Sequence, residues 1–551
     1  MEQRPWLKNY PPGIPANIDT TRYETLVDFL KECFEKYRKN IAFECMGVTH
    51  TYGEVDKQST GFAAYLHSRG LMPGERIAIM MPNCLQYPIA VFGALKAGLV
   101  IVNTNPLYTQ REMLFQFNDS GVTAIIILEN FAANLESIID KTKINTVILS
   151  SVGEMLGTVK GTLVNFAVRH IKRMVPKYQL SNTVTISHSI KEGKKFSVKE
   201  FTNRPDDVII HQYTGGTTGI SKGAMLTNRN LIANMVQIRT WMQNDLVEGK
   251  EITLSPLPMY HIFAFTVNCL AMLSYGAHTV LVTNARDLKS VIKEFHRNKI
   301  SLMTGLNTLF NALLHHDTFR ECDFSSLKIT VGGGMAIQKK VADRWKEMTG
   351  CPITEGYGLT ESSPLISVNP LDGSGKEGSI GLPVSSTEIR IVSEKNKILG
   401  INEVGEIQCR GPQVMKGYYN QPGETTTAIT PEGWLCTGDI GRLDEDGYLF
   451  IVDRKKDMIL VSGFNVFPNE IENVVSTHPK VLEVAAIGIP HEKSGEVVKV
   501  FIVKKDKSLS KEEIISYCKE NLTGYKVPKE VEFRDNLPKT NVGKILRREL
   551  K

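Results

Sequence analysis

The residue types best suited to chemistry gather in one glycine-rich stretch, residues 213–223. Its eleven residues include four glycines, three threonines, one serine and Lys222. Because glycine has no Cβ, the backbone N–H groups of such a turn can point at one spot, and the hydroxyls and the lysine add donors and positive charge. We therefore expect a polyphosphate to bind here. The spacing is not that of a Walker A loop, so a P-loop kinase or GTPase is not indicated.

The sequence on either side predicts the elements that hold this stretch. Residues 207–212 are typical of a strand, and residues 225–235 of a helix with Thr227 or Asn228 as its N-cap. A flexible Gly/Ser linker is the alternative interpretation, but such linkers rarely carry a lysine between a strand and a capped helix.

A second glycine cluster, residues 332–334, follows an apolar run at 327–330. Successive glycines after a strand let a ligand approach the backbone closely, at the edge where open α/β sheets bind their ligands. A tight turn is an equally simple interpretation, and the triplet alone does not decide between the two.

Residues 354–361 combine two glycines with three side chains that suit a nucleotide. Tyr357 lies between the glycines and could stack on a base. Thr360 offers a hydroxyl, and Glu361 offers a hard carboxylate suited to Mg²⁺. The segment lacks the third glycine of a dinucleotide fingerprint, so a dinucleotide-binding fold is not indicated.

Three later segments carry charged residues beside a glycine or at a change of pattern. Asp439 follows a glycine turn and could accept hydrogen bonds from two ribose hydroxyls, although an ordinary Gly-Asp turn would look the same. The charge run at 451–459 is either a solvated face or a hinge between domains. Lys544 follows a glycine in a basic late segment and is either part of a basic tail or a mobile catalytic cation.

The composition sets the class of protein in which these residues lie. A chain of 551 residues is too long for one ordinary core, and 42% hydrophobic with 23% charged residues is typical of a soluble globular protein. The net charge of +6 fits anionic small molecules or an anionic membrane surface, and nucleic acid is not indicated. Nine scattered cysteines without a Cys-x-x-Cys pair, and an N-terminus without a signal pattern, favour a reducing, cytoplasmic location.

Helical and extended patterns alternate from about residue 21, with continuous apolar strands at 76–81 and 123–128. That rhythm predicts an α/β fold whose parallel sheets are covered on both faces. From residue 378 short strands with Gly/Pro turns predict a small antiparallel subdomain. A second alternating block, 456–551, is long enough for a separate small domain.

Two segments bear on membranes. Residues 262–282 lack acidic and basic side chains but contain internal polar groups, so we expect a buried helix followed by a buried strand rather than a membrane span. Residues 160–177 carry five basic side chains and no acid, and on a helical wheel they form a basic amphipathic helix. Such a helix can lie on an anionic membrane, although a surface helix with a solvated basic face is the simpler interpretation.

Taken together, the motifs between residues 213 and 548 resemble those of the adenylate-forming superfamily, which comprises acyl-CoA synthetases, adenylation domains and beetle luciferases. Residues 433–472 look like the fatty acyl-CoA synthetase signature, and residues 453–470 look closest to bacterial long-chain fatty-acid–CoA ligases. The resemblance implies two doubly wound α/β sheets and a small β-barrel subdomain within residues 1–455, the barrel lying in 378–450. It also implies a mobile α+β domain at 456–551.

The resemblance assigns a role to each matching position. The residues implied to hold the phosphates of ATP are Thr214, Gly215, Gly216, Thr217, Thr218, Gly219 and Lys222. Those implied for the adenine, the α-phosphate and the ribose are Gly333, Gly334, Tyr357, Thr360, Asp439 and Arg454. Glu361 and Thr217 would bind Mg²⁺, and Lys544 would be the lysine of the adenylation step.

Four further positions follow from the same resemblance. Lys456 matches the hinge, and Gly463 would border the pantetheine tunnel after the small domain rotates. His261 would lie near the acyl entrance, with Phe265 as a gate.

The implied reaction has two steps. A fatty carboxylate attacks the α-phosphate of ATP to give acyl-AMP and pyrophosphate, and coenzyme A then displaces AMP. A ligase for a medium-chain or aryl acid, an acyl-AMP ligase that loads a carrier protein, and a non-catalytic sensor remain as alternatives. The implied partners are ATP, a long-chain fatty acid and coenzyme A, with peripheral contact on the cytoplasmic face of an inner membrane and a homodimer both left open.

Overall fold

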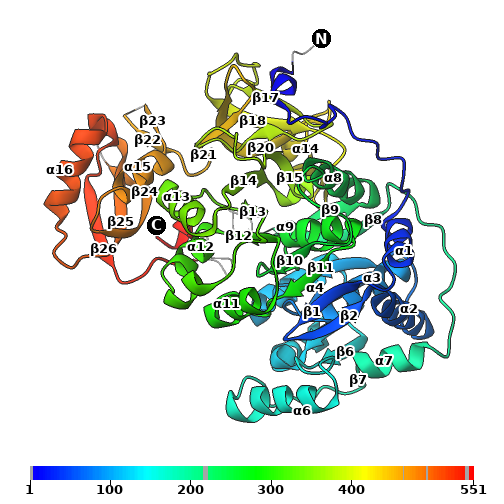
Figure 1. Ribbon diagram of the computed structural model, residues 1–551. Coiled ribbons are helices and arrows are strands. Elements are labelled where there is room, and N and C mark those ends of the chain that lie inside the picture. Colours follow the sequence, from blue (N-terminus) through cyan, green and yellow to red (C-terminus); the bar gives the residue numbers. More distant parts are fainter. Residues whose placement is uncertain (1–3, 215–220, 463, 492–493, 540–544, 551) are drawn as a thin grey trace.

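The computed structural model describes residues 4–214, 221–462, 464–491, 494–539 and 545–550. It has the predicted mixed α/β architecture, with a separate C-terminal domain beside the large body (Figure 1). In Figure 1 the C-terminal domain lies at the left, and a small antiparallel sheet lies at the top. Within the described residues, none of the helices combines the length and apolar character needed to cross a bilayer.

The first large sheet is parallel in its centre and antiparallel at one edge. Its central strands are buried on both faces, which explains their continuous apolar sequences. In spatial order the strands are β19 (Gly417–Tyr418), β9 (Lys222–Thr227), β8 (Val208–Thr214), β4 (Val100–Asn103), β3 (Arg76–Met80), β5 (Ala124–Leu128), β6 (Thr146–Ser150) and β7 (Thr183–Thr185).

The second large sheet has six parallel strands in its centre and antiparallel strands at both edges. In spatial order its strands are β16 (Leu382–Pro383), β15 (Leu365–Val368), β14 (Ile353–Gly358), β13 (Ile329–Gly332), β12 (Leu302–Gly305), β10 (Ile252–Ser255), β11 (His278–Leu281), β1 (Ile41–Cys45) and β2 (Val48–Thr51).

The small subdomain is a four-stranded antiparallel sheet in place of the expected barrel. Among the described residues its outer strands pair with no partner that would close it. The strands in order are β17 (Glu388–Val392), β18 (Gly405–Arg410), β20 (Leu435–Leu443) and β21 (Leu449–Arg454).

The C-terminal domain has hydrophobic clusters of its own, formed by residues from Ile459 onward. Its strands are β22 (Ile459–Val461), β23 (Phe464–Val466), β24 (Val481–His491), β25 (Gly495–Lys504) and β26 (Glu530–Arg534), and its helices are α15 (Pro468–Ser476) and α16 (Lys511–Asn521).

Helices cover both large sheets, and several start at a threonine that caps them. Thr25, Thr51, Thr109 and Thr227 each accept a hydrogen bond from the backbone N–H three residues on, which satisfies an otherwise unpaired donor. The helices of the large body are α1 (Leu26–Lys36), α2 (Tyr52–Ser68), α3 (Gln86–Lys96), α4 (Gln110–Ser120), α5 (Ala132–Glu136), α6 (Thr158–Phe166), α7 (Ile186–Gly193), α8 (Asn228–Trp241), α9 (Ile262–Ala264), α10 (Met272–Ser274), α11 (Leu288–Arg297), α12 (Asn307–Leu314), α13 (Lys339–Thr349) and α14 (Pro422–Ala428).

The sequence predicted the N-cap of the helix after the glycine-rich stretch correctly, but it placed the start of that helix too early, at residue 225. Thr227 caps α8, but residues 222–227 form β9, which pairs antiparallel with β8. Strands β8 and β9 therefore form a hairpin, and Thr214 pairs with Lys222 at the end where the chain passes from β8 to β9. The short segment after Lys222 shows too little alternation of apolar and polar residues to be recognised as a strand.

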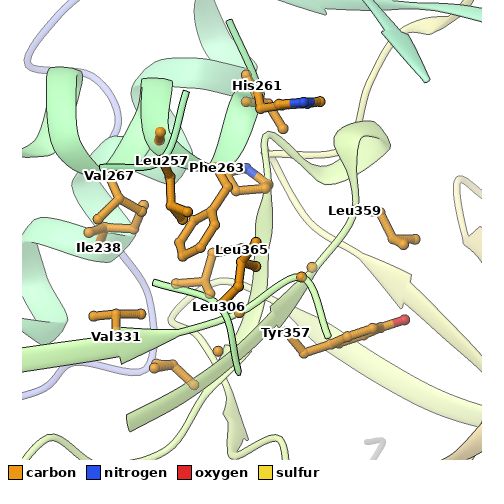
Figure 2. A pocket seen from close by; sticks show the side chains of 18 of the residues that line it. Ile238, Leu257, His261, Phe263, Val267, Leu306, Val331, Tyr357, Leu359 and Leu365 are labelled. Atoms are coloured by element: carbon orange, nitrogen blue, oxygen red, sulfur yellow. The ribbon is translucent and has the colours of Figure 1, made fainter. Parts of the chain in front are cut away.

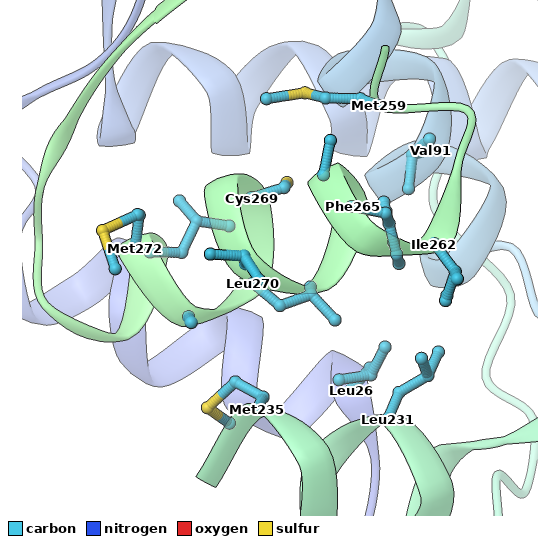
Figure 3. Close-up of a cluster of buried hydrophobic side chains, with 14 of the residues drawn as sticks. Leu26, Val91, Leu231, Met235, Met259, Ile262, Phe265, Cys269, Leu270 and Met272 are labelled. Atoms are coloured by element: carbon cyan, nitrogen blue, oxygen red, sulfur yellow. The ribbon is translucent and has the colours of Figure 1, made fainter. Parts of the chain in front are cut away.

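The apolar segment from residue 262 is a buried helix, as predicted, followed by strand β11. Its middle, Phe265–Ala271, is wound as a π-helix, a form that often occurs at functional sites. Figure 3 shows Phe265, Cys269, Leu270 and Met272 of this segment in the main core.

Candidate active site

Two adjoining cavities collect the predicted site residues. One is polar, with a volume of about 420 Å³, and the other is apolar, with a volume of about 200 Å³. Leu359 lines both, so the two cavities adjoin at this residue. The predicted residues in the polar cavity are Thr214, Lys222, Glu361, Asp439, Arg454 and Lys456. Those in the apolar cavity are His261, Gly333, Gly334, Tyr357 and Thr360.

The Asp439 carboxylate is held on two sides. The Tyr357 hydroxyl donates to its Oδ2 atom at 2.7 Å, and the Arg454 guanidinium lies 3.4 Å from its Oδ1 atom. Strands β20 and β21 impose the second contact, because Asp439 and Arg454 are directly paired across the ladder. Gly438, with φ of +70°, supplies the left-handed turn that precedes the carboxylate. Asp439 is 5% exposed, so its carboxylate is presented to the cavity in a fixed orientation.

Glu361 is fixed in the same cavity. The Tyr418 hydroxyl donates to its Oε1 atom at 2.7 Å, and the backbone N–H of Met415 donates to the Glu361 carbonyl at 2.8 Å. Burial, together with the neighbouring Glu361 carboxylate, raises the pKa of the Tyr418 hydroxyl. Tyr418 therefore stays protonated and acts as a donor. Among the described residues, no hydrogen bond to the second oxygen of this carboxylate is present.

Lys222 lies on the other side of Tyr418. Its ammonium group is 5.3 Å from the centre of the Tyr418 ring and forms an ion pair with Glu424 of α14. A lysine at the first position of β9, directly after the connection from β8, thus lines the cavity that also contains Glu361. Tyr418 thus contacts both the Lys222 ammonium group, through its ring, and the Glu361 carboxylate, through its hydroxyl.

The apolar cavity is lined by aliphatic and aromatic side chains from α8, α9, β13, β14 and β15. In Figure 2 the Phe263 ring projects into it beside Leu306 and Leu365, and Tyr357 and Leu359 lie at its other side. Gly333 lies under Phe263, where an added Cβ would be 3.2 Å from the ring. A cavity of this character suits a hydrocarbon group.

His261 lies at the start of α9 and lines the apolar cavity, as expected for a residue near an acyl entrance. Burial lowers the pKa of its imidazole to about 4. At neutral pH the ring is therefore uncharged. An uncharged imidazole suits a position among apolar side chains, where it can still donate or accept a hydrogen bond.

Phe265 does not have the predicted gate position. Its side chain is fully buried in the main core, away from the cavity lining, whereas Phe263 projects into the cavity (Figures 2 and 3). The two residues are separated by two positions on a helix, which turns their side chains to nearly opposite faces.

Comparison with known proteins identifies the family. The family model for the AMP-binding enzymes matches residues 30–419, and that for the C-terminal domain of these enzymes matches residues 470–544. The chain belongs to the AMP-binding enzyme family. Its predicted resemblance to the adenylate-forming superfamily is thereby confirmed.

Relatives within this family are similar over their full length. A long-chain-fatty-acid–CoA ligase of Escherichia coli O157:H7 is 52% identical, over 99% of this chain and 97% of the relative. A long-chain-fatty-acid–CoA ligase of Bacillus subtilis is 36% identical, over 100% of this chain and 98% of the relative. Among solved structures, an o-succinylbenzoate CoA synthetase of Bacillus subtilis with its acyl-adenylate intermediate is 27% identical, with a TM-score of 0.76 over 95% of this chain and 97% of that one.

Several positions assigned from the AMP-binding resemblance lie outside the described residues. They are Gly215, Gly216, Thr217, Thr218, Gly219, Gly463 and Lys544. The residues on either side of 540–544 are described. Lys539 and Ile545 form an antiparallel bridge, and Arg547 is tied to the body of the C-terminal domain.

Arg547 links the end of the chain to the segment after the proposed hinge. Its guanidinium donates to Glu472 at 2.7 Å, to Asn469 at 2.8 Å and to Asp457 at 3.1 Å. Asp453, fully buried, accepts a hydrogen bond from the backbone N–H of Asn469 at 2.7 Å, at the start of α15. The two networks meet at Asn469.

Sequence reasoning missed three side chains at the two cavities and one buried carboxyl next to Gly356. Tyr418 and Glu424 contact Glu361 and Lys222 but are 57 and 202 residues away in sequence. Phe263 was missed because Phe265 was predicted as the gate instead. Glu355, which precedes the glycine-bracketed tyrosine, accepts a hydrogen bond from the Ile337 backbone N–H at 3.2 Å, and burial raises its pKa to about 7. A glycine followed by two aromatics at 417–419 was the one local signal available for Tyr418.

Proposed function

We propose that this protein is an ATP-dependent long-chain fatty-acid–CoA ligase that works through an acyl-adenylate. The observation that carries the proposal is the pairing of a polar and an apolar cavity that are both lined by Leu359. A nucleotide and an apolar acid bound in the two cavities would meet at that residue. The names of the full-length relatives support fatty acid and coenzyme A as the other substrates.

Each described polar residue suits one part of ATP. Asp439, held by Tyr357, would accept hydrogen bonds from the ribose hydroxyls, with Arg454 beside it. Thr214 and Lys222 would contact the β- and γ-phosphates with the intervening residues 215–219, and Thr360 the α-phosphate. Gly333, Gly334 and Tyr357 would form the wall against the adenine.

Glu361 is the described carboxylate best suited to Mg²⁺. Magnesium in nucleotide sites is commonly bound by one or two carboxylates together with substrate phosphates. Glu361 fits because Tyr418 fixes one oxygen and leaves the other toward the cavity that contains Lys222. Thr217 would add a hydroxyl. The ion would supply charge stabilisation as negative charge moves onto pyrophosphate.

The C-terminal domain, residues 456–551, would rotate about Lys456 between the two half-reactions. In the first, Lys544 would stabilise charge between the carboxylate and ATP; in the second, Gly463 would border the path of the coenzyme A thiol. The independent hydrophobic clusters from Ile459 onward support movement as one unit, because few apolar contacts tie them to the large body.

The proposal is tested by separating the half-reactions. A cationic donor aimed at developing charge typically contributes about 10²–10³ in rate. We therefore expect Lys544→Ala to lower ATP–pyrophosphate exchange by that factor and to leave thioester formation from supplied acyl-AMP within a few-fold of wild type. Lys539→Ala, on the same late segment, is the matched control. Equal loss of both half-reactions would remove Lys544 from the first step.

The acid is tested by comparing acetate, octanoate, palmitate and coumarate in the exchange assay, followed by thioester release with free coenzyme A. Palmitate should give the highest kcat/KM. A preference for octanoate or coumarate would favour a ligase for another acid, and acyl-AMP without thioester would favour loading of a carrier protein. Absence of AMP with every acid would mean that the protein is a sensor.

We also propose that residues 158–177 contact an anionic membrane surface. The apolar side chains of this segment are exposed, as well as the basic ones that were expected to be solvated. Their exposed fractions are Val159 76%, Leu163 65%, Phe166 56%, Ile171 71% and Met174 54%. Lys172, Arg173 and Lys177 lie among them and are exposed, whereas Arg169 is paired with Glu129. In Figure 1 this helix, α6, lies at the lower margin of the molecule.

Exposed apolar residues interspersed with basic ones suit the interface of a bilayer that contains acidic lipids. Flotation with vesicles of phosphatidylglycerol and phosphatidylcholine tests this. Binding should need the acidic lipid, fall with salt and be lost in Leu163→Glu/Phe166→Glu. Val247→Glu, at another exposed apolar residue, should bind as wild type does. Unchanged binding of the double variant would reject the surface.

A further inference from the structure

The far end of the apolar cavity is formed by the last turn of α8. Ile238, Trp241 and Met242 line the cavity, and α8 ends at Trp241. The near end is the side shared with the polar cavity, where Leu359, Thr360 and Tyr357 lie. The cavity therefore has a polar-facing end and an apolar end formed by α8.

The arrangement of the domains agrees with this direction. Figure 1 shows α8 and the C-terminal domain at opposite sides of β14 and β15. A carboxylate that reacts near the C-terminal domain would point its hydrocarbon chain toward α8. The methyl end of the chain would then approach Trp241.

The α8 end is backed by the N-terminal segment and cannot recede easily. The Trp241 ring is 4% exposed and packs edge-on against Tyr10, with ring centres 5.1 Å apart. The side chains of Gln243 and Asn244 donate to the carbonyls of Gly13 and Pro12 at 2.9 and 3.0 Å. These contacts fasten the end of the helix to the segment behind it.

The side of the cavity formed by Phe263 is less constrained. A volume of about 200 Å³ is below the roughly 300–1,000 Å³ of typical ligand pockets, so the cavity must widen to admit a long chain. Phe263 is only partly buried and projects into the cavity (Figure 2), whereas Trp241 is packed on its far side. Widening at Phe263 would leave the α8 end in place.

We propose that Trp241, with Ile238 and Met242, forms the end wall of the acyl site and sets the longest chain that the enzyme accepts. The inference rests on the proposed function, since it concerns the acid of that reaction. In a hydrophobic pocket one methylene that fits or fails to fit changes kcat/KM by on the order of 10-fold or more. The wall should therefore produce a steep fall in activity beyond one chain length.

The first test locates the chain by fluorescence. The protein has four tryptophans, and Trp241 is the one in the cavity lining. Stearic acids brominated near the carboxyl, at mid-chain or near the methyl group are added to the wild type and to Trp241→Phe. The indole N–H has no hydrogen-bond partner among the described residues, so this change removes no such bond.

We expect quenching to be strongest with bromine near the methyl group and to disappear in Trp241→Phe. Strongest quenching by bromine near the carboxyl would reverse the direction of the chain and overturn the inference. Equal quenching in Trp241→Phe would overturn it as well. Because quenching requires binding but not turnover, this result is independent of whether the ligase reaction occurs.

The second test changes the wall and measures kcat/KM for saturated acids from octanoate to behenate. Ile238→Phe should move the limit to shorter acids by at least 10-fold in the laurate-to-stearate ratio, and Trp241→Leu should move it to longer ones. Val236→Phe, two positions away on α8 and outside the lining, is the matched control and should keep the wild-type profile.

The outcomes distinguish a failure of the proposed end wall from a failure of the proposed function. If no acid supports AMP formation, the proposed function fails. If acids are activated but Ile238→Phe and Val236→Phe share one profile, the end wall is wrong while the proposed function stands. Should Trp241→Leu fold poorly, Ile238→Phe and the quenching pattern still decide.

Discussion

The hydroxyl of Tyr357 donates to the carboxylate of Asp439 at 2.7 Å, and the two residues come from different sheets. The ring of the same tyrosine lines the apolar cavity, while Asp439 lines the polar one. One side chain thus spans both halves of the site. It orients the proposed ribose ligand and forms part of the wall beside the acid.

We expect Tyr357→Phe to weaken ATP binding more than acid binding. A hydrogen bond to a charged group contributes about 1.5–3 kcal/mol, and Arg454 still holds Asp439, so KM for ATP should rise by about 3–10-fold. Pyrophosphate exchange at varied ATP measures this. Asp439→Ala should show a larger rise, and Tyr448→Phe, in the small sheet, none. An unchanged KM for ATP in Asp439→Ala would count against the ribose role.

Tyr418→Phe should change the magnesium dependence of the reaction. The hydroxyl of Tyr418 orients the Glu361 carboxylate, and loss of such an outer partner typically costs about 10–100-fold in metal affinity. We expect the half-saturating Mg²⁺ concentration to rise by about 10-fold, and Glu361→Gln to raise it further. Tyr419→Phe, the adjacent ring, is the control. A normal magnesium curve for Glu361→Gln would remove Glu361 from the metal site.

Arg547→Ala should destabilise the C-terminal domain and slow adenylation. The change leaves the partly buried Glu472 carboxylate without its ion pair, although the Ala486 N–H still donates to it. We expect a loss on the order of 2 kcal/mol, below the 3–5 kcal/mol of a fully buried pair. Thermal unfolding and limited proteolysis measure it. Arg547→Ala/Glu472→Gln should recover part of the loss; equal stability of both variants would mean that Glu472 does not need the cation.

Glu355→Gln should stabilise the protein increasingly as pH rises. Burial raises the folded-state pKa of Glu355 to about 7, against 4.5 for the ordinary group. Below pH 4.5 the carboxyl is protonated in both states and carries no penalty. Between pH 4.5 and 7 only the unfolded state loses the proton readily, so the wild type loses stability, and above pH 7 the loss is constant.

The difference in Tm between Glu355→Gln and the wild type should therefore grow from pH 5 to 7 and then level off. One pKa unit corresponds to about 1.4 kcal/mol, which shifts Tm by about 3–6 °C for a domain of roughly 150–250 residues. Glu394→Gln, at an exposed turn, should give a difference that does not vary with pH. A difference that shrinks with pH would contradict the assigned direction.

The sequence predicted those features that depend on residues close together in the chain. The α/β alternation predicted the parallel sheets, because strands buried on both faces have continuous apolar sequences. Threonine 227 predicted the start of α8, because a cap needs only a side-chain oxygen near the first turn. Apart from Phe265, the predicted site residues that the structure describes line one of the two cavities.

What the sequence did not predict depends on contacts between distant segments. The segment from residue 262 is apolar on every side, so no pattern indicates that Phe263 faces the cavity and Phe265 the core. Tyr418 reaches Glu361 only because β19 joins the edge of the first sheet beside β9. The exposed apolar face of residues 158–174 is likewise invisible to a helical wheel, which does not tell whether a partner covers it.

Leu359 gives the two cavities a common wall, and this has a thermodynamic consequence. A nucleotide that shifts this side chain alters the volume open to the acid, and an acid that shifts it alters the volume open to the nucleotide. Linkage requires the two effects to be equal, so any factor by which bound ATP changes the affinity for the acid must reappear as the change in ATP affinity caused by the acid. The coupling between the substrates can thus be measured from either side.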